Sequence, residues 1–402
     1  MKKICAKTEY EVTKLIAEGG MGAVYQARLL GAEGFEKIVA IKTLLEKYAD
    51  DKIFVERFIA EAKLVANLIH ENIVQTYQLN RDRRTYYFVL EYVDGISLFD
   101  FMEFHRKIKR RLPVELAVFI VSRVARGLAY AHSRCDGNGR PLNIVHCDVC
   151  PHNILINVEG VPKLTDFGIA KAAHMNFDQD RVAGKAAFMA PEQATRGQKI
   201  DFRADIYSLG IVLFYLLSGT YTRHLDRPLP DILQEARQNK INWELLPKDL
   251  SVELIKILQH MLATDPEDRY GDTRILAQDL EYFIYKDGYG PTIVTLANYM
   301  RALMPGRFGF PDPLVKIPGF PEDSVQDVFS APPETTLVMT EEELNTIGAG
   351  KRQAKAHDGK TTVMTQRPIG NAHDGETMIM RNPEDEVEQT IVLPRKKIPS
   401  ET

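Results

Sequence analysis

Two short stretches of the chain contain the residue types that phosphoryl transfer needs. One is His146-Cys147-Asp148-Val149-Cys150-Pro151-His152-Asn153, and the other is Asp166-Phe167-Gly168. An aspartate, an asparagine five residues later and a second aspartate offer a proton acceptor and oxygen ligands for a hard cation. Together they predict a site that handles a nucleoside triphosphate with Mg²⁺.

A glycine-rich stretch precedes them. Ala17-Glu18-Gly19-Gly20-Met21-Gly22-Ala23-Val24 lies between two β-prone runs, where backbone N–H groups could bind phosphates. An ordinary hairpin turn is the alternative interpretation. Further along, Lys42 ends the run Val39-Ala40-Ile41-Lys42, and Glu61 follows in a segment with helical spacing. Alone, such a lysine or glutamate would be solvated, but their order relative to the other motifs favours a role at the site.

Three motifs follow: Ala190-Pro191-Glu192, the segment Asp205-Ile206-Tyr207-Ser208-Leu209-Gly210, and Asp265-Pro266-Glu267-Asp268-Arg269. In this order, the motifs resemble those of eukaryotic-like bacterial Ser/Thr protein kinases over roughly residues 10 to 285. The turn Gly139-Arg140-Pro141 before Ile144-Val145-His146 resembles the group common in myxobacteria. So many ordered motifs argue against coincidence.

The resemblance implies roles for single residues. The ATP-binding residues would be Ala17, Gly19, Gly22, Val24, Ala40, Lys42, Glu61, Leu90, Glu91 and Val93. Ala17 stands where the family has its first glycine. Lys42 would bind the α- and β-phosphates and pair with Glu61. The adenine would bond the hinge backbone at Glu91 and Val93, with Leu90 at the rear pocket.

The resemblance also assigns the catalytic region. Asp148 would orient the substrate hydroxyl or accept its proton, and Asn153 and Asp166 would bind Mg²⁺, with Mn²⁺ as a substitute. The remaining positions would be structural or regulatory: Phe167 and Gly168 at a turn, Glu192 paired with Arg269, Asp205 fixing the catalytic loop, and His146 as a packing residue.

Two family positions differ here. Cys147 replaces the arginine that often binds a phosphate on the activation segment, and residues 169 to 189 contain no Ser, Thr or Tyr. We therefore expect activity that does not depend on phosphorylation of that segment. Cys150 replaces the lysine that steadies the γ-phosphate, and we expect Lys185 to supply this charge instead. The alternative is a pseudokinase scaffold that binds nucleotide or partners without turnover.

Cys147 and Cys150 also form a Cys-x-x-Cys, a spacing found in redox and metal sites. The chain has no second pair of this spacing for a four-ligand zinc site. Two independent substitutions are therefore favoured over a redox role. A small-molecule phosphotransferase of the same fold is disfavoured, because Glu192 and Arg269 belong to a peptide-binding segment in the resembling family.

The pattern of apolar residues along the chain predicts the strands and helices that must position these residues. Strands are expected near residues 13–16, 23–27, 37–42 and 86–90, and helices over 51–68, 113–132, 205–218 and 252–263. The predicted fold is α+β: a two-lobed kinase fold with a β-rich small lobe (1–94) and a helical large lobe (95–304). A Pro/Gly-rich linker (305–333) and a mostly disordered tail (334–402) would follow.

Bulk composition limits the alternatives. The 402 residues are 45% apolar and 26% charged, with a formal net charge of −4, which favours neither nucleic acid nor a membrane as partner. The first residues lack an apolar run, so we expect no signal peptide, and the apolar stretch 206–217 is too short to span a bilayer. Four cysteines make no disulfide framework, and a cytoplasmic location is expected.

The tail contains a repeated pattern of threonine followed by apolar residues, at Thr336, Thr362, Thr377 and Thr390. These threonines are candidate autophosphorylation sites, and phosphothreonine there could recruit a forkhead-associated domain. Addition of a strand to a partner's sheet and a tail without function are the alternatives. Protein substrates are the main expected partners.

Overall fold

The computed structural model describes residues 9–18, 22–45, 48, 50–82, 85–167, 186–223, 227–312 and 314–320, together with 378–379 and 390–391. The side chains of residues 53, 54, 57, 61 and 63 are outside this description. Several predicted site residues therefore lie outside the described residues: Gly19, Gly168, Lys185, Thr336, Thr362 and Thr377.

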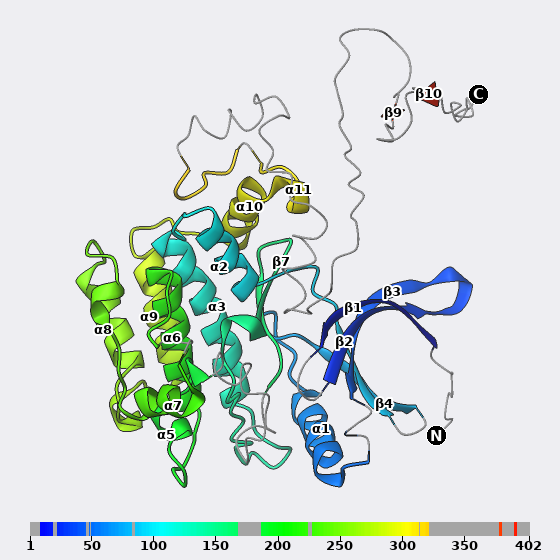
Figure 1. Ribbon diagram of the computed structural model, residues 1–402, viewed down its shortest axis with the longest axis horizontal. Coiled ribbons are helices and arrows are strands. Elements are labelled where there is room, and N and C mark those ends of the chain that lie inside the picture. Colours follow the sequence, from blue (N-terminus) through cyan, green and yellow to red (C-terminus); the bar gives the residue numbers. More distant parts are fainter. Residues whose placement is uncertain are drawn as a thin grey trace. The chain divides into compact units, whose positions relative to one another are not determined.

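The small lobe is an antiparallel sheet with the spatial order β1-β2-β3-β5-β4 (Figure 1). Its strands are β1 (Glu9–Glu18), β2 (Gly22–Leu30), β3 (Glu36–Leu44), β4 (Thr76–Asp82) and β5 (Thr85–Glu91), with the short turn η1 (Ala32–Gly34) before β3. The strands expected from β-branched and aromatic runs are confirmed. In the register of β3 against β5, Lys42 faces Phe88 and Ala40 faces Leu90.

Helix α1 (Lys52–Val65) packs against this sheet, as its helical spacing predicts (Figure 1). Phe58 of α1 stacks on Phe88 of β5, with the ring centroids 4.1 Å apart. Both rings are buried, together with Leu44 and Ala62. This contact places α1 directly beside the strand that faces Lys42.

The large lobe is mainly helical (Figure 1). Its helices are α2 (Leu98–Lys107), α3 (Val114–His132), α5 (Pro191–Ala194), α6 (Arg203–Ser218), α7 (Leu229–Arg237), α8 (Val252–Met261), α9 (Thr273–Tyr285), α10 (Ile293–Leu303) and α11 (Pro305–Phe308), with 3₁₀ turns η3 (Pro151–Asn153), η4 (Trp243–Leu245) and η5 (Pro266–Asp268). Side chains of Ser97, Ser251 and Asp272 cap α2, α8 and α9. Helix α6 is apolar nearly all round because the core encloses it, and it ends at Gly219 in the left-handed region.

A small second sheet lies beside the catalytic region. It consists of β6 (Gly95–Ser97), β7 (Ile154–Asn157) and β8 (Pro162–Leu164), in that spatial order. Strand β7 follows the catalytic loop directly, and β8 leads into Asp166. At Gly95 a Cβ atom would lie 2.0 Å from the carbonyl oxygen of Ile156, so the close approach of β6 to β7 requires glycine.

Residues 305–320 differ from the expected linker. Helices α10 and α11 and the residues after them pack on the large lobe, with Tyr299 and Ile317 buried in its main core. His105 of α2 lies within 2.9 Å of the Tyr299 hydroxyl through Nε2, and Arg110 lies over the ring of Phe320. The large lobe therefore extends through residue 320, because local composition does not reveal apolar residues that are buried by distant partners.

The rest of the chain is described only at two short strands. Met378–Ile379 (β9) pairs antiparallel with Thr390–Ile391 (β10), and these belong to a separate unit, 350–402. Within the described ranges, no helix has both the length and the apolar character needed to cross a bilayer.

Candidate active site

The catalytic loop is fixed by a carboxylate from another element. Asp205, in the first turn of α6, accepts hydrogen bonds from the backbone N–H of His146 (2.7 Å) and of Cys147 (2.8 Å). His132 of α3 lies 2.9 Å from the same carboxylate. Cys147 has a φ of +62°, a strained conformation for a residue with a side chain, and these bonds stabilise it. The expected contact between Asp205 and the loop is present.

The ring of His146 joins the loop to the residue before Asp166. The backbone N–H of Asp148 donates to Nδ1 of His146 at 3.2 Å, and Nε2 lies 3.0 Å from the carbonyl oxygen of Thr165. Because an N–H can only donate, Nδ1 is unprotonated and Nε2–H is the donor to Thr165. His146 is fully buried, in agreement with the structural role predicted for it.

Asp148 and Asn153 contact each other directly. The Asn153 side-chain amide nitrogen donates to the backbone oxygen of Asp148 at 2.8 Å and to its Oδ2 at 2.9 Å. Asn153 lies in η3, where Pro151 begins the turn. Since the amide nitrogen faces Asp148, the oxygen Oδ1 of Asn153 is the end of this side chain that could bind a cation.

The two lobes meet at an ion pair. Nζ of Lys42, on β3, lies 2.9 Å from Oδ1 of Asp166, in the loop after β8. Asp166 has a φ of +59°, which turns the chain sharply at this residue. Glu61 lies in α1 as expected, but its side chain is outside the description. The predicted Lys42–Glu61 pair therefore stays a prediction.

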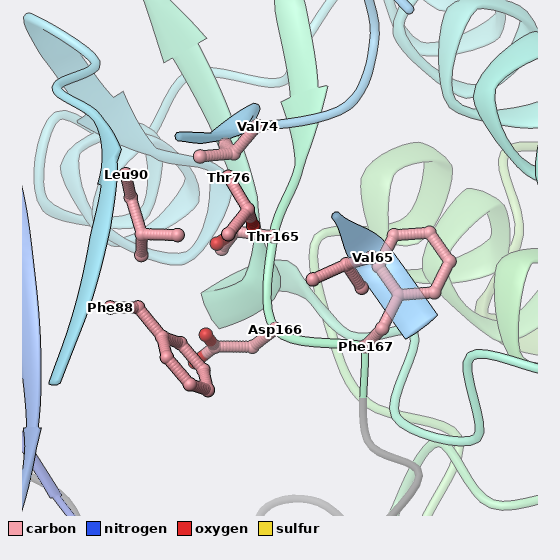
Figure 2. A pocket seen from close by; sticks show the side chains of 8 residues that line it. All are labelled: Val65, Val74, Thr76, Phe88, Leu90, Thr165, Asp166 and Phe167. Carbon is pink, nitrogen blue, oxygen red and sulfur yellow. The ribbon is translucent and has the colours of Figure 1, made fainter. Parts of the chain in front are cut away.

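A small pocket opens behind this ion pair (Figure 2). Leu90 and Phe88 of β5 line it on one side, and Asp166 and Phe167 line it on the other. Leu90 is thus where a rear-pocket residue is expected. The sequence analysis missed the other lining residues, which lack a distinctive local pattern: Val65, Val74, Thr76 and Thr165.

An apolar cluster gathers the residues predicted to contact the adenine. Ala40 and Leu90 are buried in it, and Val24, Val93 and Leu155 pack against it. The sequence analysis missed Leu155, which comes from β7 of the large lobe. The sequence contained a pattern that could have identified Leu155. The side chains of β7 alternate between two faces, so that Ile154 and Ile156 are buried on one face and Leu155 lies on the other.

The hinge residue Glu91 is bonded on three sides. Its backbone N–H donates to the carbonyl oxygen of Gln75 at 2.8 Å. Its carboxylate lies 2.9 Å from Nζ of Lys163 on β8 and also accepts from the backbone of Gln75. An adenine could therefore meet only the backbone carbonyl of Glu91, and a hydrogen bond to it would run from the adenine amino group.

In the glycine-rich stretch, Ala17 and Gly22 differ in the space around them. Ala17 lies on β1 opposite Val24 of β2, next to an irregularity in the register. A Cβ atom at Gly22 would lie 2.4 Å from the carbonyl oxygen of Thr43 on β3. Gly22 is thus required by the packing of β2 on β3, independently of any contact with nucleotide.

The two catalytic-loop thiols are sheltered. Cys150 is 1% exposed and belongs to the large-lobe core. Burial, together with the nearby carboxylates of Asp205 and Asp148, raises the pKa of the Cys147 thiol well above its usual range. Cys135, Cys147 and Cys150 are all free thiols. These surroundings suppress the thiolate that redox chemistry needs.

The segment after the activation segment is joined to the core and to the catalytic loop. Arg269 binds the carboxylate of Glu192 with two hydrogen bonds, of 2.6 and 2.9 Å, and both side chains are buried. This is the expected pair. Gln193 was not predicted: its Nε2 donates to the carbonyl oxygen of Cys147 at 3.0 Å, and its Oε1 accepts from the N–H of Ala190.

Comparison with known proteins is consistent with this geometry. The family described as "Protein kinase domain" matches residues 10–281. Tyrosine-protein kinase MasK of Myxococcus xanthus is 37% identical over 304 residues, which cover 75% of this chain and 46% of MasK. Serine/threonine-protein kinase PrkC of Bacillus subtilis is 33% identical over 278 residues, which cover 68% of this chain and 40% of PrkC.

This chain thus spans less than half the length of these relatives. A solved structure of the Mycobacterium tuberculosis PknI kinase domain is 28% identical, with a TM-score of 0.49, and the match covers 68% of this chain and 95% of the other. The family match reaches from the small lobe into α9 of the large lobe and includes every motif of the site described above. The chain belongs to the protein kinase family.

Proposed function

We propose that this chain transfers the γ-phosphoryl group of ATP to serine or threonine hydroxyl groups of proteins. The observation that supports this most directly is the convergence of two pairs from separate elements. Lys42 contacts Asp166 at 2.9 Å, and Asn153 contacts Asp148 at 2.9 Å. The first pair provides positive charge for phosphates beside a carboxylate for a cation, and the second holds a carboxylate for the acceptor hydroxyl.

In this proposal, Asp148 accepts a hydrogen bond from the acceptor hydroxyl and orients its oxygen toward the γ-phosphorus. The new bond joins that oxygen to phosphorus, the bond from the γ-phosphorus to the β–γ bridging oxygen breaks, and ADP leaves. Asp148 receives the hydroxyl proton. Lys42 neutralises charge on the α- and β-phosphates, and Val24, Ala40, Leu90, Val93 and Leu155 enclose the adenine.

The chain's oxygen donors fit a Mg²⁺ ion. Asn153 turns its amide nitrogen toward Asp148, so its amide oxygen is the donor available to a cation, and Asp166 adds a carboxylate. Hard cations of this type take oxygen ligands of these kinds. When bound, Mg²⁺ would supply positive charge that stabilises the triphosphate oxygens during transfer.

The acceptor amino acid is part of the proposal. PrkC and the PknB proteins of mycobacteria are named as serine/threonine kinases, whereas MasK is named as a tyrosine kinase. We favour serine and threonine because several relatives at 33 to 34% identity carry that name. Phosphoamino-acid analysis of the labelled product decides between the acceptors, and phosphotyrosine alone would contradict this choice.

The test is transfer of label from γ-³²P-ATP to a generic protein substrate, comparing the wild type with Asp148→Asn. The amide keeps the shape of the carboxylate but cannot accept the proton, so turnover should fall by about 10²-fold or more. Asp231→Asn, an exposed change on α7, is the matched control. Equal turnover in wild type and Asp148→Asn would contradict the assignment.

The second candidate is a pseudokinase scaffold. Burial of Cys150 in the core favours it, since no charge reaches the γ-phosphate from that position. Calorimetry of ATP binding in the presence of Mg²⁺, together with the label-transfer assay, separates the two candidates. A wild type that binds ATP with Mg²⁺ but transfers no label is a scaffold.

We also propose that Lys185 supplies the charge that Cys150 lacks, and that activity does not depend on phosphorylation of the activation segment. Residues 169 to 189 offer no acceptor hydroxyl. Lys185→Met should reduce turnover strongly, and near-normal turnover of this variant would contradict the role. Phosphatase treatment of the wild type should leave its activity intact.

The tail threonines complete the proposal as autophosphorylation sites that could bind a forkhead-associated domain. Thr336, Thr362, Thr377 and Thr390 are each followed by an apolar residue. Mass spectrometry after incubation with Mg²⁺ and ATP tests this directly. Tail threonines that remain unmodified would leave strand addition to a partner as the better interpretation.

A further inference from the structure

A buried arginine lies beneath the loop that follows the activation segment. Arg223, after α6, is 1% exposed. Its Nη1 lies within hydrogen-bonding distance of the carbonyl oxygens of Ala186 (3.0 Å), Ala187 (2.9 Å) and Met189 (2.9 Å), so that its two hydrogens are shared among three acceptors. Three carbonyl groups of one short loop thus point at a single guanidinium group.

No carboxylate balances this charge among the described residues, where the ion pairs do not include Arg223. Glu235, an acid whose charge acts on Arg223, is paired with Arg227 at 2.8 Å. Burial lowers the pKa of Arg223, yet an arginine side chain stays charged in proteins. A desolvated cation is costly, and an apolar residue would fill the same space more favourably. The presence of an arginine at this buried position is therefore explained by the carbonyl groups that it binds, and not by the packing of its side chain.

Tyr207 of α6 links this arginine to a second one. Nη2 of Arg223 donates to the Tyr207 hydroxyl at 2.9 Å, and that hydroxyl donates to Oδ1 of Asn239 at 2.6 Å. The guanidinium of Arg269 lies 4.8 Å from the centre of the Tyr207 ring and binds Glu192. Residues 186–192 are thus held at both ends by arginines that share one tyrosine.

The held loop borders the place where a protein substrate must bind. Gln193 joins it to the backbone of Cys147, the neighbour of Asp148. Ala186 and Met189 form an apolar cluster with Ile232, and α5 packs against α7 at this side of the lobe (Figure 1). A shift of this loop would move the acceptor hydroxyl relative to Asp148, whereas Lys42 and the adenine-facing cluster lie in other elements.

We propose that Arg223 is a positioning residue that fixes the protein-substrate loop, residues 186–190, through its carbonyl groups. The inference rests on the proposed function and adds a specific determinant of protein-substrate use. The cation is built into the fold, so the loop needs no phosphate on the activation segment to be held. By fixing this loop, Arg223 would affect the use of the protein substrate and leave the binding of nucleotide unchanged.

The test compares wild type with Arg223→Met, Arg223→Lys and Tyr207→Phe. Lysine keeps the charge without the planar fork, and phenylalanine removes the oxygen that accepts from Nη2. Arg274→Met, at an arginine of α9 whose side chain is 69% exposed, is the matched control. The measurements are kcat and KM for a protein substrate, the Kd for ATP with Mg²⁺, and hydrogen exchange of the amides of residues 186–190.

Arg223→Met should lower kcat/KM for the protein substrate by about 10-fold or more, mainly through KM, and change the Kd for ATP by less than about two-fold. Exchange of the loop amides should become faster. Arg223→Lys and Tyr207→Phe should show smaller shifts in the same direction, and Arg274→Met none. If Arg223→Met does not fold, these two milder variants decide.

Unchanged KM and unchanged loop exchange in folded variants would overturn the inference, even if their unfolding temperature falls. An equal loss of ATP affinity would overturn it as well, because the effect would then not be confined to the loop. A wild type without phosphoryl transfer would refute the proposed function alone, and exchange of the loop amides would still decide whether Arg223 fixes the loop.

Discussion

At the residue scale, the surroundings of the cysteines determine their chemistry more than their spacing does. Cys147 and Cys150 have the spacing of redox pairs, but burial and neighbouring carboxylates keep the Cys147 thiol protonated and Cys150 lies in the core. Cys135, by contrast, is exposed. The three cysteines that the structure describes thus offer an internal comparison.

We predict that iodoacetamide at mildly alkaline pH labels Cys135 at least about 10-fold faster than Cys147 or Cys150. The reason is that the thiolate is the reactive form and burial disfavours it. Mass spectrometry of peptides from a time course gives the three rates. Peroxide followed by dithiothreitol should likewise leave phosphoryl transfer unchanged. Labelling of Cys147 as fast as Cys135 would contradict the prediction.

A second prediction concerns Gly22. In Gly22→Ala the new methyl group would lie 2.4 Å from the carbonyl oxygen of Thr43, so β2 and β3 must move apart. The free energy of unfolding should fall by about 1–3 kcal/mol, the usual cost of overpacking. Urea unfolding measures it. Gly137→Ala is the control, since its Cβ would meet open space; an equal effect in both variants would refute the argument.

At the element scale, the contact between α2 and α10 contains a buried histidine. His105 has Nδ1 2.8 Å from the carbonyl oxygen of Phe101 and Nε2 2.9 Å from the Tyr299 hydroxyl. Because the carbonyl can only accept, Nδ1 carries the proton and the Tyr299 hydroxyl donates to Nε2. Burial lowers the pKa of His105 to about 4, so the neutral form is the folded form.

This gives a pH prediction with a definite sign. Since the pKa of His105 is about 4 in the fold and about 6.5 when unfolded, the unfolded chain binds more protons between these values. The contribution of His105 to the free energy of unfolding is complete above the unfolded pKa and is lost as pH falls toward 4. The total loss is on the order of 3 kcal/mol. Wild type should therefore lose more stability on acidification than His105→Gln. Parallel pH profiles of unfolding would contradict this.

At the scale of the whole molecule, the packed fold continues beyond the residues that match the family. The match ends at residue 281, but Leu296, Tyr299, Met300 and Ile317 are all buried in the large-lobe core. At Gly160, between β7 and β8, a Cβ atom would lie 2.1 Å from the carbonyl oxygen of Ile293, so α10 touches this turn backbone to backbone. Arg307 of α11 donates to the carbonyl oxygen of Gly95.

We predict that a chain ending at residue 286, directly after α9, is less stable than one ending at residue 320. The loss should be on the order of 5 kcal/mol or more, because several large apolar side chains leave the core. Thermal and urea unfolding of the two chains measure the difference. Equal unfolding midpoints would show that α10 and α11 contribute nothing to the fold.

Much of the fold and of the site could be predicted from the sequence, because local patterns specify local structure. β-Branched runs predicted β3 and β5, helical spacing predicted α3 and α6, and the ordered motifs singled out Lys42 and Asp166, which the structure brings into contact. Arg223 could not be found this way, since an arginine in a connection usually lies in solvent. The linker predicted for residues 305–333 does not hold for residues 305–320, because the burial of Ile317 depends on partners that are distant in the sequence.

The contacts of Asp205 have a consequence for how such loops vary. The carboxylate binds backbone N–H groups of His146 and Cys147, and Gln193 binds the carbonyl of Cys147, so no side chain at position 147 takes part. Every amino acid except proline carries that N–H. The loop can therefore exchange its arginine for cysteine and keep its shape. A search for the letters His-Arg-Asp would overlook such chains, whereas the distant aspartate that holds the backbone would reveal them.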